Sequence, residues 1–128
     1  MLTPKMLVKK VNEQVFTVLK SKVKYENVSG TNYYICNNLE TKGDKYILHC
    51  LEIIDLHYTD KTSQLIVDFD EILTLKECDL KDYSIINKIP KKLDTCVIKK
   101  LQNKVADATE KRYRYWLVQV IFKQGNKR

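Results

Sequence analysis

The chain has 128 residues, of which 44% are hydrophobic and 30% charged, so it can build one modest domain but not two. Its apolar runs stop short of the roughly 18 residues that suggest a membrane span, and its first residues lack the uninterrupted apolar region of a signal peptide, so we expect an intracellular protein. The formal net charge of +7 favours acidic partners such as nucleic acid, because basic segments attract phosphate backbones.

The first half of the chain predicts a β-meander. A short N-terminal segment is followed by VFTVLKSKVKY at 15–25, which alternates as a half-buried strand does. NVSGTN then supplies a turn into a second extended stretch, NYYICNN. A further turn, ETKGDK, precedes the long strand KYILHCLEIIDLHY at 45–58, and the loop TDKTS returns into SQLIVDF.

The second half predicts one helix and two strands. DEILTLKECDLKDYSIINKIP at 70–90 has leucines and isoleucines at roughly helical spacing, with Pro90 as a stop. LDTCVIKKLQNK at 93–104 is assigned as a strand, although its later residues are also compatible with a helix. KRYRYWLVQVIFK at 111–123 is β-branched and aromatic, and it predicts a strand with Trp116 in the core.

We interpret the meander as three strands. Followed by a helix and two strands, it has the connectivity of the OB-fold, a small barrel. We therefore predict a mainly β fold, a five-stranded OB-fold barrel with a helix between strands 3 and 4. The long strand at 45–58 would curve around the core and serve both halves of the sheet. The expected organisation is an N-terminal segment over 1–14, an OB-fold domain over 15–124 and a basic tail over 125–128.

The order of these segments resembles the C-terminal OB domain of the large subunit of replication protein A and its paralogues. The resemblance runs from about Val15 to Phe122 and is carried by the basic and aromatic residues before YIL, the isoleucine-aspartate at the end of that strand, and the basic-aromatic last strand. It implies a non-catalytic nuclear subunit that binds single-stranded DNA, or another nucleic acid, together with other protein subunits of a replication, telomere or DNA-modifying complex.

The cysteines depart from that family, whose zinc ribbon uses two close cysteine pairs before YIL. Cys36, Cys50, Cys78 and Cys96 are widely spaced, and ETKGDK is too short to hold a ribbon. A structural zinc needs about four ligands, so we expect no metal and no other cofactor. We expect free thiols, buried where Cys50 and Cys96 lie in apolar runs.

Charge divides the chain into three parts. Residues 1–25 hold six basic residues and one acid, 26–87 hold five against twelve, and 88–128 hold twelve against three. Single strands are held by cations along the backbone and by aromatic rings that stack on bases, each stack contributing about 1–3 kcal/mol. The candidate nucleic-acid-binding residues are Lys22, Lys24, Tyr25, Tyr34, Lys99, Lys100, Lys104, Lys111, Arg112, Arg114 and Tyr115, with Tyr33 and Tyr113 as further aromatic candidates.

Two other functions remain open at this point. The acidic centre could face a basic partner in a protein–protein adaptor without DNA contact; its residues are Asp68, Asp70, Glu71, Glu77, Asp79 and Asp82. ENVSGTNYYI is similar to the Q-x-V-x-G hairpin of the cystatins, which inhibit cysteine proteases, but the leading glutamine is missing, and we rank this alternative last. Both histidines belong to one strand, and neither G-x-S-x-G nor a phosphate-binding glycine loop occurs, so we expect no catalysis.

Overall fold

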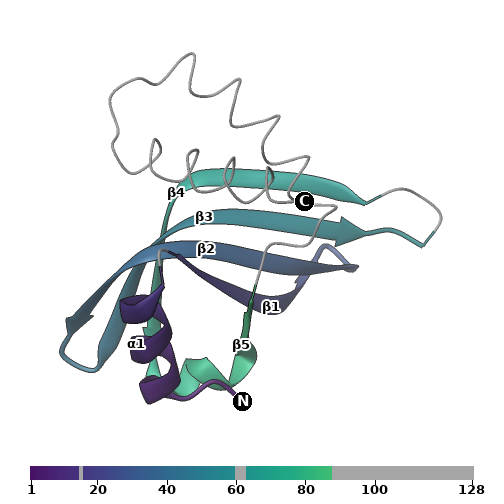
Figure 1. Ribbon diagram of the computed structural model, residues 1–128. Helices are drawn as coiled ribbons and strands as arrows, with labels where there is room; N and C mark the ends of the chain where they lie inside the picture. Colours follow the sequence, from purple (N-terminus) through teal and green to yellow (C-terminus); the bar gives the residue numbers. More distant parts are fainter. Residues whose placement is uncertain (15, 60–62, 88–128) are drawn as a thin grey trace, which may run out of the picture. The chain divides into compact units, whose positions relative to one another are not determined.

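The computed structural model describes residues 1–14, 16–59 and 63–87 (Figure 1). The chain divides into one unit over Met1–Asn87 and another over Lys88–Arg128, and the described residues all belong to the first. The strands predicted at 93–104 and 111–123 lie outside the described residues, and the domain boundaries predicted at residues 14 and 124 stay predictions.

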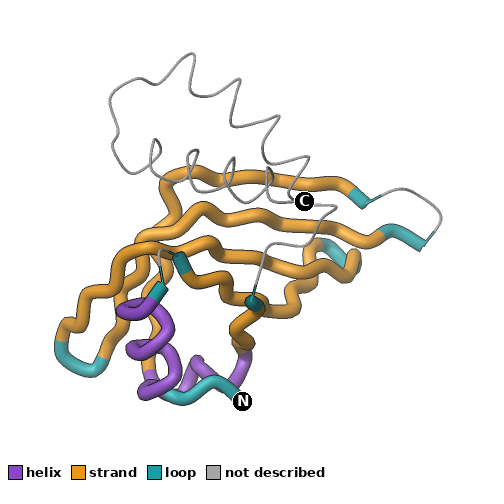
Figure 2. The backbone as a smooth tube through the Cα atoms, in the orientation of Figure 1, coloured by secondary structure: helices purple, strands orange, loops and turns teal. Residues whose placement is uncertain are grey.

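One five-stranded antiparallel sheet forms the described unit, in the order β4-β3-β2-β1-β5 (Figures 1 and 2). The prediction of a mainly β fold is confirmed. β4 and β5 are the edges of the described sheet, which does not close into a barrel. The strands are β1 (Thr17–Tyr25), β2 (Val28–Lys42), β3 (Lys45–His57), β4 (Gln64–Lys76) and β5 (Tyr83–Ile86).

The first hairpin turns earlier than the sequence predicts. Glu26 and Asn27 both have positive φ, 45° and 71°, as a two-residue type I′ turn requires. Gly30 therefore lies inside β2 and not in a turn. A Cβ at Gly30 would come within 2.9 Å of the Asp55 carbonyl oxygen, so glycine is needed there for the close approach of two backbones. The turn predicted in ETKGDK is confirmed, with Gly43 at φ 63° between β2 and β3.

The helix predicted at 70–90 is wrong. β4 continues to Lys76, and a six-residue 3-10 helix, η1 (Glu77–Asp82), then leads into β5. The alternation explains the difference: Leu73 and Leu75 are buried while Ile72 and Thr74 are exposed, which is the period of a strand. Pairing with β3 satisfies the backbone of this segment and overrides its helical leucine spacing.

A helix that the sequence analysis did not assign, α1 (Pro4–Glu13), precedes the sheet. The Thr3 side chain caps it by accepting a hydrogen bond of 3.3 Å from the Met6 N–H, and Pro4 occupies the first turn, where a missing N–H costs nothing. The Thr-Pro pair was the available signal. No helix in the described part of the chain is long and apolar enough to cross a bilayer.

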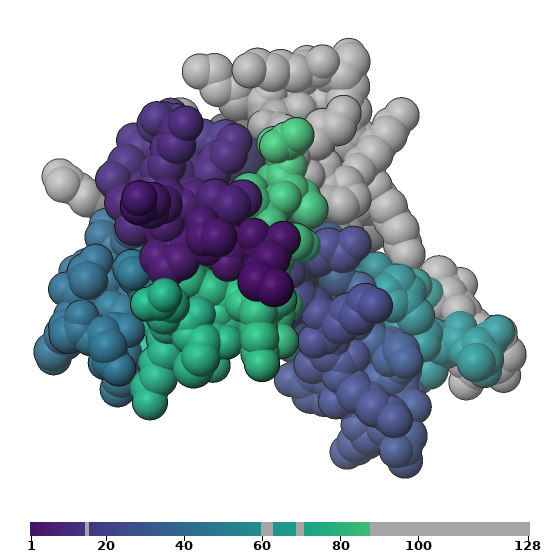
Figure 3. Space-filling view, turned by 90° about the horizontal axis from the view of Figure 1, so that it is seen from below, coloured from purple at the N-terminus to yellow at the C-terminus, as the bar shows by residue number. Residues whose placement is uncertain are grey.

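The described core lies between one face of the sheet and the two helices. Figure 3 shows α1 beside η1 and β5, and Figure 1 places all three at the same end of the sheet. Leu7 and Val11 of α1 and Leu80 of η1 are buried against the strands. The opposite face of the sheet also carries buried side chains, namely Val18, Ile35, Leu51 and Ile53.

Cys36 and Cys50 form a disulfide in the structure, so the prediction of free thiols is wrong for this pair. Both residues are fully buried. Cys78 is free, but it is exposed, and Cys96 lies outside the described residues. Disulfides are commoner in oxidising compartments than in the nucleus or cytosol, and the nuclear location stays a prediction.

Candidate nucleic-acid interface

Three lysines line one face of β1. Lys20, Lys22 and Lys24 alternate along the strand and are all exposed, so strand geometry directs them to the same side. Consecutive members of the row are about 7 Å apart along the strand. Neither of the salt bridges found between described residues involves them. The sequence analysis named Lys22 and Lys24 but missed Lys20, which the alternation K-x-K-x-K in LKSKVKY could have revealed.

The two tyrosines predicted to join these lysines do not share their surface. Tyr25 is 45% exposed, but it follows Lys24 directly, and strand alternation sends it to the other face. Tyr34 is only 6% exposed and belongs to the core, with its ring 6.1 Å from that of Tyr83. Tyr34 therefore offers no free ring face to a base. Tyr33 is half-buried on β2 beside Lys20.

The other candidates lie outside the described residues, so their placement stays a prediction: Lys99, Lys100, Lys104, Lys111, Arg112, Tyr113, Arg114 and Tyr115.

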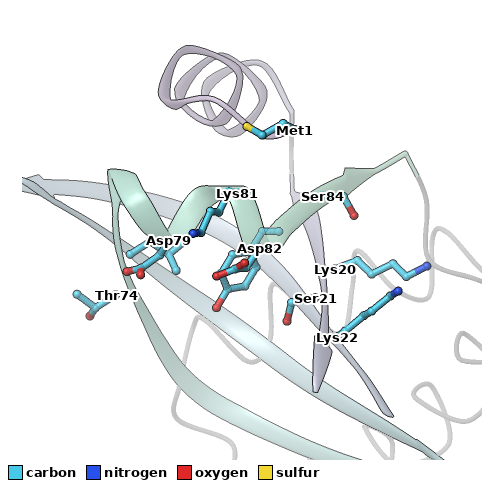
Figure 4. A pocket seen from close by; sticks show the side chains of 11 residues that line it. Met1, Lys20, Ser21, Lys22, Thr74, Asp79, Lys81, Asp82 and Ser84 are labelled. Carbon is cyan, nitrogen blue, oxygen red and sulfur yellow. The ribbon is translucent and has the colours of Figure 1, made fainter. Parts of the chain in front are cut away.

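A pocket of about 790 Å³ opens beside the lysine row, between β1, η1 and β5 (Figure 4). We call it the β1–η1 pocket. Lys20 and Lys22 of β1 line it, with their ammonium groups directed away from η1, and η1 itself contributes Asp79, Lys81 and Asp82. Hydroxyl groups complete the polar lining, from Ser21, Thr74, Tyr83 and Ser84. The sequence could not reveal this pocket, because its walls come from segments more than 50 residues apart.

Two lining residues have a defined local role. The Asp79 carboxylate accepts a 2.9 Å hydrogen bond from the Lys76 N–H and so fixes the start of η1. Burial raises the pKa of Tyr83, and the nearby carboxylates of Asp79, Asp82 and Glu52 raise it further. The Tyr83 phenol therefore stays protonated at neutral pH and can donate a hydrogen bond.

A second polar group is built by a β-bulge. Glu52 pairs with Asp68, but Cys50 pairs with Glu71, so β4 has one more residue than β3 between these pairs. Residues three apart normally face opposite sides of a strand, and the bulge brings Asp68 and Glu71 to the same side. One oxygen of each of Glu52, Asp68 and Glu71 lies within 4.8 Å of the others. Such a carboxylate cluster can bind a hard divalent cation or the basic groups of a partner.

A buried network supports this carboxylate cluster from β2. Asn32, 8% exposed, donates from Nδ2 to the Tyr34 hydroxyl at 2.9 Å and to Glu52 Oε2 at 3.1 Å. Burial and the hydrogen bond to Glu52 raise the pKa of Tyr34. Burial, with the charges of Glu52 and Asp68, also raises the pKa of Glu71. Three carboxylates this close to one another favour the uptake of a proton or a cation.

The end of the β3–β4 hairpin places a serine, a histidine and an aspartate in a row. His57 Nδ1 lies 3.3 Å from Ser63 Oγ, and His57 Nε2 lies 3.6 Å from Asp55 Oδ2. The sequence analysis did not foresee this arrangement, because Ser63 precedes β4 and approaches His57 only through the pairing of β3 with β4. Acyl transfer also requires oxyanion donors and a substrate cleft, and the β1–η1 pocket includes none of the three residues. Absence of catalysis stays a prediction.

Comparison with known proteins adds no family. No protein-family model, no curated protein and no solved structure matches this chain. The functional argument therefore rests on the geometry of the chain itself.

Proposed function

We propose that this protein is a non-catalytic subunit that binds single-stranded nucleic acid along β1, within a larger complex. The observation that carries the proposal is the exposed row of Lys20, Lys22 and Lys24 on one face of that strand. An extended single strand presents phosphates at a regular spacing, and cations repeated along a β-strand can neutralise several of them in sequence. The OB-fold barrel, the nuclear location and the partner subunits belong to the same proposal.

The surroundings of the row support it. The β1–η1 pocket, with its hydroxyl groups, opens beside Lys20 and Lys22. The cystatin alternative has no such support, because Gly30 of its motif is buried inside β2 and does not form an exposed hairpin tip.

The test is a matched pair of triple variants of the full chain. The first variant replaces Lys20, Lys22 and Lys24 by alanine. The control variant replaces Lys42, Lys45 and Lys76 by alanine. The control residues are exposed and cross-strand neighbours at the far ends of β2, β3 and β4, so both variants lose the same charge. Binding to a fluorescent oligonucleotide should weaken at least tenfold in the first variant and less in the control. Equal losses in both would contradict a specific site on β1.

An adaptor function is the second candidate, and the carboxylate cluster favours it. Glu52, Asp68 and Glu71 gather on one face of the described sheet, and Asp68 and Glu71 belong to its edge strand β4. A cluster of carboxylates at the edge of a sheet suits a basic partner. If this is the function, Asp68→Lys with Glu71→Lys should abolish partner binding and leave oligonucleotide affinity unchanged.

A further inference from the structure

The sheet face that carries α1 and η1 has a second apolar area, outside the core beneath the two helices. Leu56 of β3 and Val23 of β1 meet above Gly30, because a Cβ at Gly30 would lie 2.9 Å from Leu56 Cδ2 and 3.3 Å from Val23 Cγ1. Leu19, on the same face of β1 as Val23, belongs to the core cluster of the described residues, whereas Leu56 does not. The apolar surface of this face therefore continues beyond the helices toward the β1–β2 turn.

Strand register extends this area over three strands. Ile54 and Ile66 are direct partners on β3 and β4, and Ile54 shares a face with Leu56, two residues further on. Tyr25 follows Val23 on the same face of β1. Tyr25 and Ile66 are each 45% exposed, and exposed apolar side chains grouped on one face mark an interaction site. We call the surface of Val23, Tyr25, Ile54, Leu56 and Ile66 the hairpin patch.

Carboxylates border the hairpin patch. Glu52 and Asp68 form the next cross-strand pair on the same face of β3 and β4, and one oxygen of Glu71 lies within 4.8 Å of an oxygen of each. The lysine row points to the opposite face, because its members alternate with the β1 residues of the patch. The hairpin patch therefore repels nucleic acid and complements a partner that carries basic groups beside apolar ones.

The helix α1 shows what kind of segment this face accepts. It buries Leu7 and Val11, four residues apart, against the strands and leaves Lys5 and Lys9 exposed. Figure 3 shows this face, with the β1–β2 hairpin in dark blue beyond η1 and β5 in green. Helices commonly cover the apolar face of a sheet, and an amphipathic helix binds through apolar side chains at the same spacing.

From these observations we infer that the hairpin patch binds a basic amphipathic helix of a partner subunit. The apolar side chains of that helix contact Tyr25, Leu56 and Ile66, and its arginines or lysines pair with Glu52 and Asp68. The inference rests on the proposed role as a subunit, which both candidate functions share, and it names the surface that meets the partner. Because the lysine row lies on the opposite face, the protein can bind the helix and a nucleic acid at the same time.

The first test titrates designed helical peptides into the full chain and follows the binding by NMR. The probe peptide has leucines along one face and arginines beside them. One matched peptide has glutamate in place of each arginine, and another has serine in place of each leucine. The probe should shift signals of the hairpin patch, and both matched peptides should bind at least tenfold more weakly. No binding of the probe, shifts confined to other surfaces, or equal binding of the three peptides overturns the inference.

The second test compares two double variants that each remove two exposed apolar side chains. Tyr25→Ser with Ile66→Thr changes the patch. Met6→Ser with Ile72→Thr changes side chains of similar exposure, 45% and 56%, on α1 and on the opposite face of β4. The patch variant should bind the probe peptide at least tenfold more weakly, and the control variant should bind it within about twofold of the wild type. Equal losses in two folded variants overturn the inference.

Two further measurements separate this inference from its alternatives. Sedimentation of the full chain that shows a dimer, dissociated by Tyr25→Ser with Ile66→Thr, assigns the patch to a second copy and overturns the partner helix. Saturation with the probe peptide should leave oligonucleotide affinity unchanged, and competition between the two overturns the separation of the faces. Wild-type oligonucleotide affinity after loss of the lysine row contradicts the proposed nucleic-acid function and leaves the peptide result standing.

Discussion

Cys36 of β2 and Cys50 of β3 lie directly opposite one another, with their Cα atoms 4.3 Å apart, and are joined by a disulfide. The β2–β3 pairs from Lys42–Lys45 to Asn38–His49 keep one register. If that register continued, Cys50 would lie opposite Asn37. A register shift between Cys36 and Asn38 brings the two cysteines into one pair. The bulge therefore makes the disulfide possible.

Removing this disulfide should destabilise the protein. The bond joins residues 14 apart in the sequence. Closing a loop of that length lowers the conformational entropy of the unfolded chain, which stabilises the folded state by about 3 kcal/mol. Cys36→Ala with Cys50→Ala should lower the free energy of unfolding by about 3 kcal/mol in urea denaturation. Cys78→Ser, at the exposed free cysteine, is the control and should change it by less than about 0.5 kcal/mol. A double variant as stable as the wild type would show that the bond does not form in solution.

Gly30→Ala should destabilise the sheet through a steric clash. The added Cβ would lie 2.9 Å from both the Asp55 carbonyl oxygen and Leu56 Cδ2, and the carbonyl belongs to a paired backbone that cannot move cheaply. Overpacking of this kind costs about 1–3 kcal/mol. Thermal denaturation measures the loss, and Ser29→Ala, at the exposed neighbouring position, serves as the comparison. Equal stability of the two variants would contradict the close approach of β2 and β3.

Glu71→Gln should change how stability depends on pH. The folded-state pKa of Glu71 is raised by burial and by Glu52 and Asp68, so the folded state binds its proton more tightly than the unfolded state does. The wild type therefore loses stability as pH rises from below the ordinary glutamate pKa through the raised one. Glutamine removes this loss, so the stability of the variant relative to the wild type should be higher at pH 7 than at pH 4. The difference in the free energy of unfolding should be less than about 1 kcal/mol, because the Glu71 side chain is partly solvated.

The measurement for Glu71→Gln is urea denaturation at several pH values, with Glu26→Gln at an exposed turn position as the control. The control should show no comparable pH dependence. A wild type and a Glu71→Gln variant whose stabilities run parallel from pH 4 to pH 7 would mean that the three carboxylates do not interact.

The lysine row should determine part of the salt dependence of nucleic-acid binding. Each phosphate neutralised on a single strand contributes about 0.7 to the slope of log affinity against log salt. Alanine at Lys20, Lys22 and Lys24 should therefore reduce the slope by about 2, measured by fluorescence anisotropy across a salt series. An unchanged slope, with folding verified by circular dichroism, would separate these lysines from the phosphate backbone.

The sequence by itself determined the features that depend on local pattern. Alternation in VFTVLKSKVKY at 15–25 predicted β1, and the segment ETKGDK predicted the β2–β3 turn, where the positive φ of Gly43 favours glycine. The Thr-Pro start of α1 was equally local, although the sequence analysis did not use it. Lys22 and Lys24 could be placed on one face for the same reason, since strand parity depends on sequence position alone.

Only the tertiary structure decided the features that depend on which strands pair. Leu73 and Leu75 fit a helix or a strand, and pairing with β3 selected the strand. Two bulges then set the chemistry: one aligned Cys36 with Cys50, and the other brought Glu71 to the side of Asp68. A one-residue shift in register turns every following side chain of the strand to the opposite face of the sheet. No local pattern encodes such a shift, because it results from the fit of strands that are distant in sequence.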